Sequence, residues 1–228
     1  MNTFTDFEAG FSGLPFKLID VSEISLEDEF LQYEPFYNKA REFKKEMIEA
    51  LKNYPKKKLY VSIYDPAENK DGTGIVFKKG MKPAVGHSFE WHKKAAEEYM
   101  PAYKSRLCTK SEYILFLAYL MKKMSEHGWG IEELWDAVTK NSKKLGQYRV
   151  AGVKSMLQPT GSKGLFEFHD LANTIKFIAS DDGEADYYIA SGAYHNPPDA
   201  ANVADIAKTY CPNDPYDNAV GKVVFMAE

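Results

Sequence analysis

Apolar residues recur at every third or fourth position between Pro35 and Pro55. They are Phe36, Ala40, Phe43, Met47 and Leu51. A helix turns once every 3.6 residues, so this spacing puts all five on one helical face. Proline suits a first helical turn, and Pro55 stops the pattern. The sequence therefore predicts a helix between the two prolines, with one buried face that begins at Phe36.

Two further helices carry capping signals in the middle of the chain. Ser88 can cap a helix over residues 89–100, which Pro101 ends. Thr109 and Glu112 form a Thr-x-x-Glu capping box, in which each side chain hydrogen-bonds a backbone N–H of the other residue. The helix behind this box is rich in apolar residues and should end at His127, because glycine commonly follows a helix.

A third helix is predicted over residues 131–145, closed by Gly146. Its apolar face holds Ile131, Leu134, Trp135, Val138 and Leu145. Three consecutive helices with short links usually pack as antiparallel neighbours. We therefore expect a three-helix cluster in the helical middle of the chain, residues 86–146.

Strand patterns lie on both sides of this middle. Residues 58–66 alternate apolar and polar positions, and the turn signal NKDGTG should join them to a strand over 74–80 as a hairpin. Residues 221–227 read as a last strand. These segments predict an antiparallel sheet built from N-terminal and C-terminal strands.

The part from 150 to 228 is rich in β patterns. We expect a short strand over 165–170 and a hairpin whose arms, 173–180 and 185–194, meet at an Asp-Gly turn. The segment 170–179 also fits a helix capped by Asp170, and the hairpin is favoured. Residues 201–210 suggest a short helix.

Helices in the middle with strands on both sides indicate the α+β class: a central three-helix cluster packed on an antiparallel sheet. The chain has 228 residues, a length that suits one generous domain. We expect a single globular domain over 1–228. Residues 1–24 are aperiodic and could form an extended arm along its body.

Charge and composition narrow the classes of function. The net charge is −4, and three of the 29 basic residues are Arg, so the chain lacks the basic face of a nucleic-acid binder. Nucleic acid is therefore an unlikely partner. Aromatic residues make up 14% of the chain, with 15 Tyr and 14 Phe. Such a content predicts a ring-lined core or a ring-lined surface groove.

The same sequence argues for a cytoplasmic protein without a membrane partner. Its two cysteines, Cys108 and Cys211, follow no framework spacing. The N-terminal segment lacks the apolar stretch of a secretory signal. The longest apolar run, 113–121, is far shorter than the roughly 20 residues that a bilayer span needs, and it predicts a buried helix.

Residues 158–164, QPTGSKG, resemble a phosphate-binding loop in composition but not in order. A P-loop needs Gly-Lys-Ser/Thr before a helix, whereas here Ser162 precedes Lys163 and Gly164 follows it. The segment is better explained as a turn, with glycines where the backbone needs a positive φ.

Histidines are the candidates for chemistry, since imidazole is the usual general base and metal ligand. His169 stands next to Asp170, and His195 lies in the polar, Pro-rich loop GAYHNPPD. We take His169, His195 and Asp170 as catalytic candidates. His87 and His92 are five residues apart, which is not the spacing of a helical zinc motif, so no metal site is predicted. No pattern specifies a cofactor.

Aromatic residues are the candidates for binding. Tyr187 and Tyr188 are neighbours on a predicted strand and must face opposite sides, so one of them should be exposed. With Trp129, Tyr194 and His195, Tyr188 could rim a surface that holds a ligand.

Three hypotheses of function follow, and the sequence does not decide whether the protein is an enzyme. The first is a non-enzymatic binding or interaction protein with an aromatic-rimmed surface, whose partner is a small molecule or a protein. The second is a hydrolase that uses His169 or His195 with an acidic residue. The third is a structural or assembly subunit of the viral or prophage type. The oligomeric state does not follow from the residues.

Overall fold

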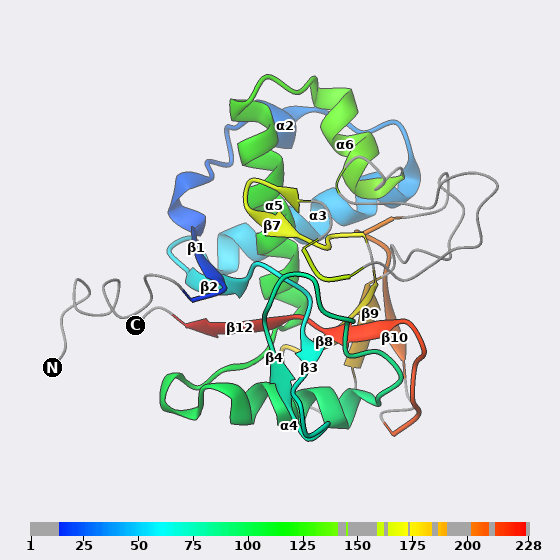
Figure 1. Ribbon diagram of the computed structural model, residues 1–228. Coiled ribbons are helices and arrows are strands. Elements are labelled where there is room, and N and C mark those ends of the chain that lie inside the picture. The colour runs from blue at the N-terminus through cyan, green and yellow to red at the C-terminus, as the bar shows by residue number, and fades with distance from the viewer. Residues whose placement is uncertain are drawn as a thin grey trace, which may run out of the picture.

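Two four-stranded sheets run through the middle of the molecule, with helices on either side of them (Figure 1). The structure is a computed structural model. It describes residues 14–140, 145, 159–161, 164–172, 174–183, 187–190, 202–209 and 213–226.

The first sheet joins the two ends of the described chain. Its strand order is β1-β2-β12-β5, and all its pairs are antiparallel. The strands are β1 (Phe16–Asp20), β2 (Lys58–Ser62), β5 (Arg106–Leu107) and β12 (Val223–Met226). The predicted sheet of N-terminal and C-terminal strands is therefore confirmed. Its strand β1 lies within residues 1–24, the segment predicted as an arm.

The second sheet has the order β10-β9-β8-β11. Its strands are β8 (Ile175–Ala179), β9 (Tyr187–Ala190), β10 (Ile206–Thr209) and β11 (Ala219–Gly221). The antiparallel pair β8–β9 confirms the predicted hairpin and excludes the helix considered for the first arm. The short helix predicted over 201–210 is wrong, because Ile206 to Thr209 form an antiparallel ladder with β9.

Two short ladders correct two further predictions. Strand β4 (Ile75–Val76) pairs with β3 (Ala67–Glu68) rather than with β2, which already lies between β1 and β12. Residues 165–170 are not one strand, since β6 (Gly164–Leu165) folds back on β7 (Phe168–His169). The turn between them uses positive φ angles of 50° at Phe166 and 71° at Glu167.

The helices largely follow the predicted apolar faces, but the helix predicted over 131–145 ends at Thr139. They are α2 (Glu29–Gln32), α3 (Asn38–Asn53), α4 (Phe89–Tyr99), α5 (Lys110–Glu126) and α6 (Ile131–Thr139), with single 3-10 turns η1 (Val21–Glu23) and η2 (Pro101–Tyr103). Ser88 caps α4, and the Thr109–Glu112 capping box is present at the start of α5. Residues 113–121 are all buried in α5, as the apolar run predicted.

The three predicted helices do not form one cluster. Helices α5 and α6 pack with α2 and α3 above the sheets, whereas α4 lies below them (Figure 1). Two separate groups of buried apolar residues reflect this division. Met47, Leu120 and Trp135 belong to the upper core, while Phe89, Phe177 and Phe225 belong to the lower one. Short links placed α4 next to α5 in sequence, but the sheets separate them.

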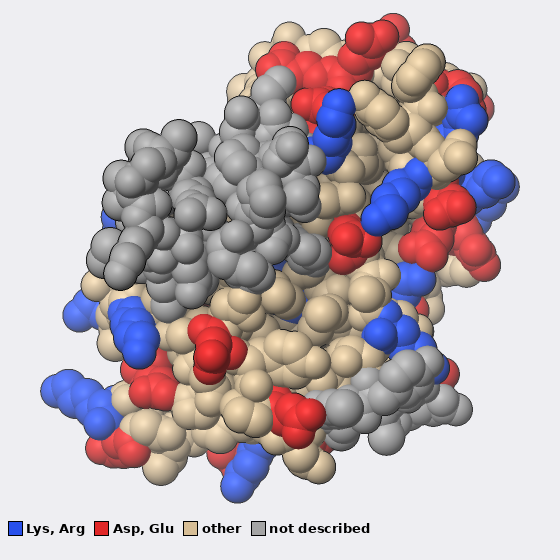
Figure 2. Space-filling model, turned by 90° about the vertical axis from the view of Figure 1, so that its right-hand side faces the viewer, with Lys and Arg blue, Asp and Glu red and all other residues tan. Residues whose placement is uncertain are grey.

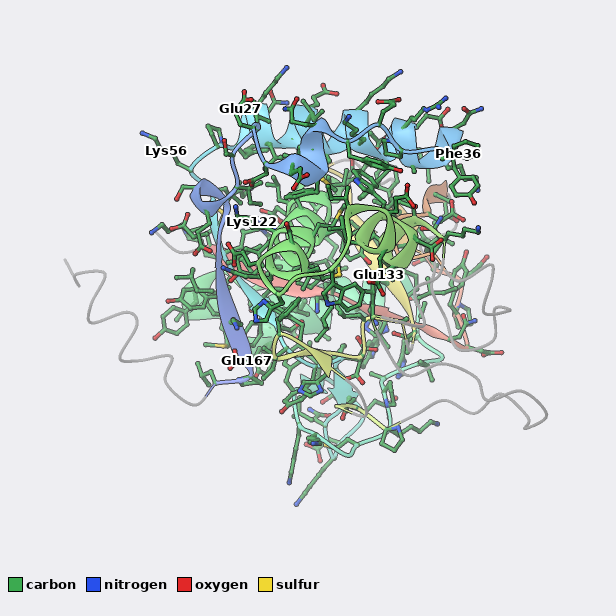
Figure 3. All side chains as sticks on the ribbon, turned by 90° about the horizontal axis from the view of Figure 1, so that it is seen from above. Glu27, Phe36, Lys56, Lys122, Glu133 and Glu167 are labelled. Carbon is green, nitrogen blue, oxygen red and sulfur yellow. The ribbon has the colours of Figure 1, made fainter. Side chains whose placement is uncertain are left out.

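Phe36 is the largest departure from the predicted helix face. Helix α3 begins at Asn38, so Phe36 precedes it and 80% of its surface is exposed. The other four residues of the predicted stripe are buried. Seen from above, Phe36 lies at the periphery beside one end of α3 (Figure 3).

The structure also bears on the predictions about membrane spans and cysteines. No helix in the described ranges combines the length and hydropathy needed to cross a bilayer. Cys108 is buried and free, and burial raises the pKa of its thiol well above the ordinary value. Cys211 lies outside the described residues.

Candidate binding pocket

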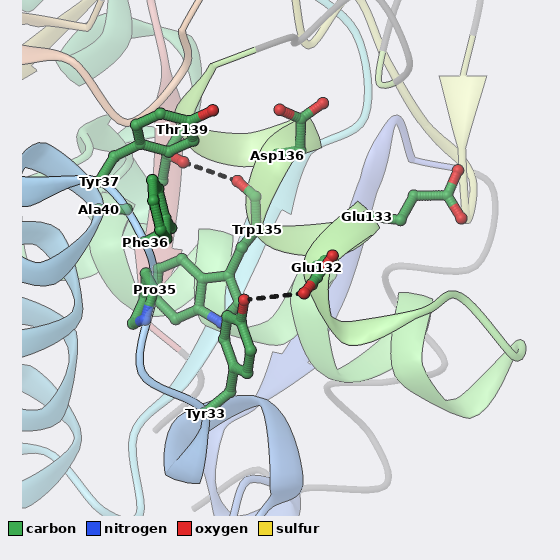
Figure 4. Close-up of a pocket in the computed structure, with 10 residues that line it drawn as sticks. All are labelled: Tyr33, Pro35, Phe36, Tyr37, Ala40, Glu132, Glu133, Trp135, Asp136 and Thr139. Carbon is green, nitrogen blue, oxygen red and sulfur yellow. Dashed lines mark hydrogen bonds between the residues drawn. The ribbon is translucent and has the colours of Figure 1, made fainter.

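A pocket opens between the segment that leads from α2 into α3 and the outer face of α6 (Figure 4). Its volume is about 480 Å³, within the roughly 300–1,000 Å³ that is usual for ligand sites. The lining is made by Tyr33, Pro35, Phe36, Tyr37, Ala40, Glu132, Glu133, Trp135, Asp136 and Thr139. The two sides of the pocket therefore come from segments about 100 residues apart in sequence, and packing of α3 and α2 on α6 brings them together.

The floor of the pocket is buried, and an indole ring forms part of it. Trp135 is 3% exposed, and its indole N–H donates a hydrogen bond of 2.9 Å to the carbonyl of Phe30. Ala40, 1% exposed on the first turn of α3, lies beside it. A buried tryptophan needs a partner for its N–H, and this bond fixes the ring that the pocket exposes at its base.

The rim is aromatic and open. Phe36 and Tyr37 are adjacent, with ring centroids 5.7 Å apart and an edge-to-face angle of 85°. Tyr37 is 49% exposed. Tyr33 completes the rim from the end of α2, and Figure 4 shows its ring close to Trp135 and Pro35. The rings of Tyr33, Phe36 and Tyr37 thus surround the opening of the pocket, and the ring of Trp135 lies at its base.

The wall contributed by α6 is acidic. Glu132 and Asp136 are four residues apart and so lie on the same helix face. The hydroxyl of Tyr33 donates to the Glu132 carboxylate at 3.4 Å. Desolvation and this negative charge raise the pKa of Tyr33. Figure 4 shows Glu132 reaching the Tyr33 hydroxyl and Asp136 on the next turn of α6, while Glu133 points away from the aromatic residues.

A lysine of the chain itself already contacts the aromatic rim. The ammonium of Lys140 lies 4.7 Å from the centroid of the Tyr37 ring and donates to its hydroxyl at 2.8 Å. This hydrogen bond and the electrostatic attraction of Tyr37 raise the pKa of Lys140, and the charge of Asp136 adds to them. Lys140 therefore lies at the hydroxyl edge of the Tyr37 ring.

The structure places two of the predicted binding residues away from this pocket. Tyr188 is half-buried on β9 against the upper core, and Lys110 lies 5.4 Å from its ring centroid. Its neighbour Tyr187 is fully buried in the lower core, so the two do face opposite sides. Trp129 is half-buried beside the upper core. Tyr194 and His195 lie outside the described residues, and all four remain predictions as ligand contacts.

The turn predicted at 158–164 is partly described. Gly161 has a φ of +74°, as a turn glycine should, and its N–H donates to the Asp170 carboxylate at 2.7 Å. Gly164 does not serve as a turn residue, because it pairs with His169 in the β6–β7 ladder. Ser162 and Lys163 lie outside the described residues.

His169 is described without a carboxylate partner. Its ring is tilted against that of Tyr64 at 5.1 Å, and its Nδ1 atom is buried with no hydrogen-bond partner in the described part of the chain. Desolvation, then the charge of Lys79, lowers the pKa of His169. The predicted pairing of His169 with Asp170 as a catalytic unit stays a prediction.

Asp170 belongs instead to a buried polar network. One carboxylate oxygen, Oδ2, accepts from the N–H groups of Asp65 and Gly161, whereas Oδ1 is buried without a partner among the described residues. Lys176 donates to Asp65 Oδ1 at 2.6 Å and to the Asp170 carbonyl at 2.9 Å. Burial, then the charge of Asp65, raises the pKa of Asp170 to about 6. A carboxyl in such surroundings holds its proton more tightly than in water.

His87 and His92 each have partners other than a metal ion in the described part of the chain. His87 bonds Glu68 and stacks on Trp91, with ring centroids 3.8 Å apart. Desolvation, then the charge of His87, lowers the pKa of the buried His92 to about 3. Over the ranges that the structure describes, no group of three or more His, Cys, Asp or Glu could hold a metal ion.

Comparison with known proteins adds little to this geometry. No family model matches the chain, and no curated protein matches it. The chain is similar to a solved structure, PvdO from Pseudomonas aeruginosa, at 13% sequence identity and a TM-score of 0.48. The match covers 93% of this chain and 92% of that one. A likeness at this level carries no argument about function.

Sequence reasoning missed the pocket because it assigned Phe36 to a buried helix face. Phe36 and Trp135 both match the helical spacing of core residues, but of the two only Trp135 is buried. The signal that could have found the pocket is YEPFY, residues 33–37, where three aromatic residues surround a proline. Three rings around a helix start exceed what one buried stripe can take, because residues one apart face different directions.

Proposed function

We propose that this protein is a binding protein, and that the pocket between the α2–α3 connection and α6 holds its ligand. The observation that carries this proposal is Phe36, a phenyl ring 80% exposed at the mouth of a preformed pocket. Fully burying a phenylalanine side chain stabilises a protein by about 1.5–3 kcal/mol. Phe36 contributes little of this in the free protein, so its ring is available to a ligand.

The combination of a fixed floor and an open rim supports the same proposal. Trp135 is held by packing and by its bond to the Phe30 carbonyl, so it cannot move away to fill the cavity. Ligand sites are typically preformed, mostly apolar and supplied with a few convergent polar groups. Here the convergent groups are Glu132, Asp136 and the hydroxyl of Tyr33.

The test uses a set of small aromatic and aliphatic fragments that includes cationic, neutral and anionic members. Binding is followed by amide chemical-shift changes in the ¹⁵N-labelled full chain. We expect fragments to perturb Tyr33, Tyr37 and residues of α6 together. Phe36→Ala should weaken that binding at least about fivefold with no change in melting temperature, because its ring makes few contacts in the free protein.

Leu26→Ala is the matched control, since Leu26 is an exposed apolar residue, 37% exposed, that does not line this pocket. It should leave fragment binding unchanged. If fragments bind equally well to Phe36→Ala, or perturb only residues distant from α6, the pocket is not the binding site.

A further inference from the structure

We infer that the ligand of this pocket is an organic cation, such as an amine or a quaternary ammonium group. This inference rests on the proposed function and specifies the chemistry of the same site. It depends on the charge of one wall, the character of the opposite wall and the contact that Lys140 already makes.

The first argument is charge. Three of the ten lining residues, Glu132, Glu133 and Asp136, are acidic, and among the lining residues that the structure describes none is Lys or Arg. Figure 2 views the side of the molecule on which Phe36 lies in Figure 3, and acidic side chains gather at the upper end of that face. A concave site lined by charges of one sign concentrates ligands of the opposite sign.

The second argument is that helix electrostatics explain only part of this charge. Glu132 and Glu133 lie in the first turn of α6, where carboxylates interact favourably with the helix dipole. Asp136 lies in the second half of the same short helix, where the dipole does not favour an acid. It is attracted by Lys140, four residues further on, and repelled by Glu132, four residues before it. A bound cation beside both carboxylates would remove that repulsion.

The third argument is the aromatic wall. Phenyl, phenol and indole rings attract cations to their faces, with a strength of about 0.5–2 kcal/mol. Phe36 and Tyr37 present their rings from the opposite side of the pocket to Glu132 and Asp136 (Figure 4). A site with aromatic faces on one side and carboxylates on the other should bind an alkylammonium group more tightly than a neutral group of the same shape.

The fourth argument is that Lys140, a cation of the chain itself, already contacts the aromatic rim. Its ammonium lies 4.7 Å from the centroid of the Tyr37 ring and donates to the Tyr37 hydroxyl. Lys140 is thus both evidence that the Tyr37 side chain accepts a cation and a like charge at the edge of the site. Removing this charge should strengthen the binding of an external cation.

The experiment compares three probes of nearly identical shape in chemical-shift titrations of the full chain. Choline carries a trimethylammonium group, 3,3-dimethylbutan-1-ol carries a neutral tert-butyl group in its place, and 3,3-dimethylbutanoate is the anionic counterpart. We expect choline to bind at least about fivefold more tightly than the alcohol, which corresponds to about 1 kcal/mol. The anion should not bind measurably.

Three variants assign this preference to the residues named. The double variant Glu132→Gln with Asp136→Asn should abolish the preference for choline and leave binding of the alcohol unchanged, because both substitutions keep size and hydrogen-bonding oxygens. Lys140→Met should tighten choline binding about twofold or more. Glu126→Gln, on α5 outside the pocket, is the matched control and should change neither probe.

The outcomes separate this inference from the proposed function. If the alcohol binds in a Phe36-dependent manner and choline binds no more tightly, the pocket is a binding site but its ligand is not a cation. If no probe binds, or if Phe36→Ala does not weaken the binding of any probe, both proposals fail. A choline preference that survives the double variant contradicts the role given to the two carboxylates.

Discussion

Two buried carboxylates, Glu112 and Asp170, have different ionic surroundings, and their pKa values are shifted in opposite directions. Glu112 is 0% exposed and Asp170 is 1% exposed. Glu112 lies beside two cations, Arg106 and Lys57. Asp170 lies near the buried Lys176 and Lys222 but also near a second carboxylate, that of Asp65. The pKa of Glu112 is about 2 and that of Asp170 about 6, and the negative charge of Asp65 is one cause of this difference.

The hydrogen bonds to each carboxylate are a second cause of the difference in pKa. Burial opposes ionisation of Glu112, but Arg106 donates to both of its oxygens at 2.6 Å and Lys57 lies at 2.7 Å. The backbone N–H of Thr109 also donates, which completes the capping box. Every one of these bonds favours the charged form.

Asp170 receives only backbone donors, and one of its oxygens receives none in the described part of the chain. The ammonium of Lys176 goes to the side chain of Asp65 and to the carbonyl of Asp170, not to its carboxylate. The ammonium of Lys222 donates to the Ser62 carbonyl. The two cations near Asp170 thus donate to other oxygens, whereas the cations beside Glu112 also donate charge-assisted hydrogen bonds to its carboxylate.

The largest effect on stability should follow from breaking the hydrogen bonds of Glu112 with Arg106 and Lys57. Glu112→Gln replaces an acceptor oxygen with an NH₂ group that faces the donors of Arg106 and Lys57. We expect a loss of about 3–5 kcal/mol in the free energy of unfolding at pH 7, measured by urea denaturation. Glu126→Gln on the same helix should lose far less, since its pairs with Lys122 and Lys123 are partly exposed.

The stability lost in Glu112→Gln should become smaller as the pH falls. The pKa of Glu112 is lower in the folded protein than its ordinary value of 4.5, so ionisation stabilises the fold above pH 4.5. That stabilisation, about 3 kcal/mol, disappears as the pH falls from 4.5 towards 2. The free energies of unfolding of the wild-type protein and of Glu112→Gln should therefore approach each other below pH 4.5. If they do not, this account is wrong.

A smaller effect, of opposite sign, should follow from changing Asp170. Its folded pKa of about 6 is higher than the ordinary 3.8, so ionisation destabilises the fold as the pH rises from about 4 to above 6. Asp170→Asn removes that charge and keeps an acceptor for Gly161. Its φ of 59° also suits asparagine. We expect a gain of up to about 3 kcal/mol at pH 7.5.

Thermal and urea unfolding at pH 4 and pH 7.5 measure this gain. The two proteins should have equal stability at pH 4, because Asp170 is then largely protonated. Asp217→Asn, an exposed aspartate, is the control and should behave as the wild-type protein at both pH values. A stability loss in Asp170→Asn at pH 7.5 would show that the ionised carboxylate is better compensated than its contacts indicate.

The smallest effect should come from an exposed ion pair. Lys94 and Glu98 lie 3.9 Å apart on α4, with side chains 76% and 60% exposed. Such pairs contribute little because water screens them. Lys94→Ala should change the free energy of unfolding by no more than about 0.5 kcal/mol, in the same urea experiment. A loss as large as that of Glu112→Gln would mean that burial is not what separates the two kinds of pair.

Local signals in the sequence were sufficient for much of the fold. The capping box at Thr109, the cap at Ser88 and the β8–β9 hairpin each depend on a few adjacent residues, and each prediction is confirmed. The α+β class follows from the same elements. Pairings between distant segments were harder, because alternation does not identify the partner strand. This is why β4 was assigned to β2 and residues 201–210 to a helix.

The candidate site could not be predicted in the same way. A ring at helical spacing is expected to be buried, and only the start of α3 at Asn38, after Phe36, leaves that ring on the surface. The acidic wall comes from α6, about 100 residues later. Histidines attracted attention for their chemistry, yet His169 lacks a carboxylate partner in the described ranges. The pocket is a product of tertiary packing rather than of any local motif.

The position of β12 between β2 and β5 has a consequence for how the protein is made. A ribosome releases β1, β2 and β5 well before residues 223–226, so the first sheet lacks an inner strand until those residues emerge. Until that strand arrives, Tyr60 and Leu107 lack the neighbours that cover them in the finished protein. The lower core can therefore close only after β12 has been made, and the apolar surface that nascent chains expose until then favours their association with one another.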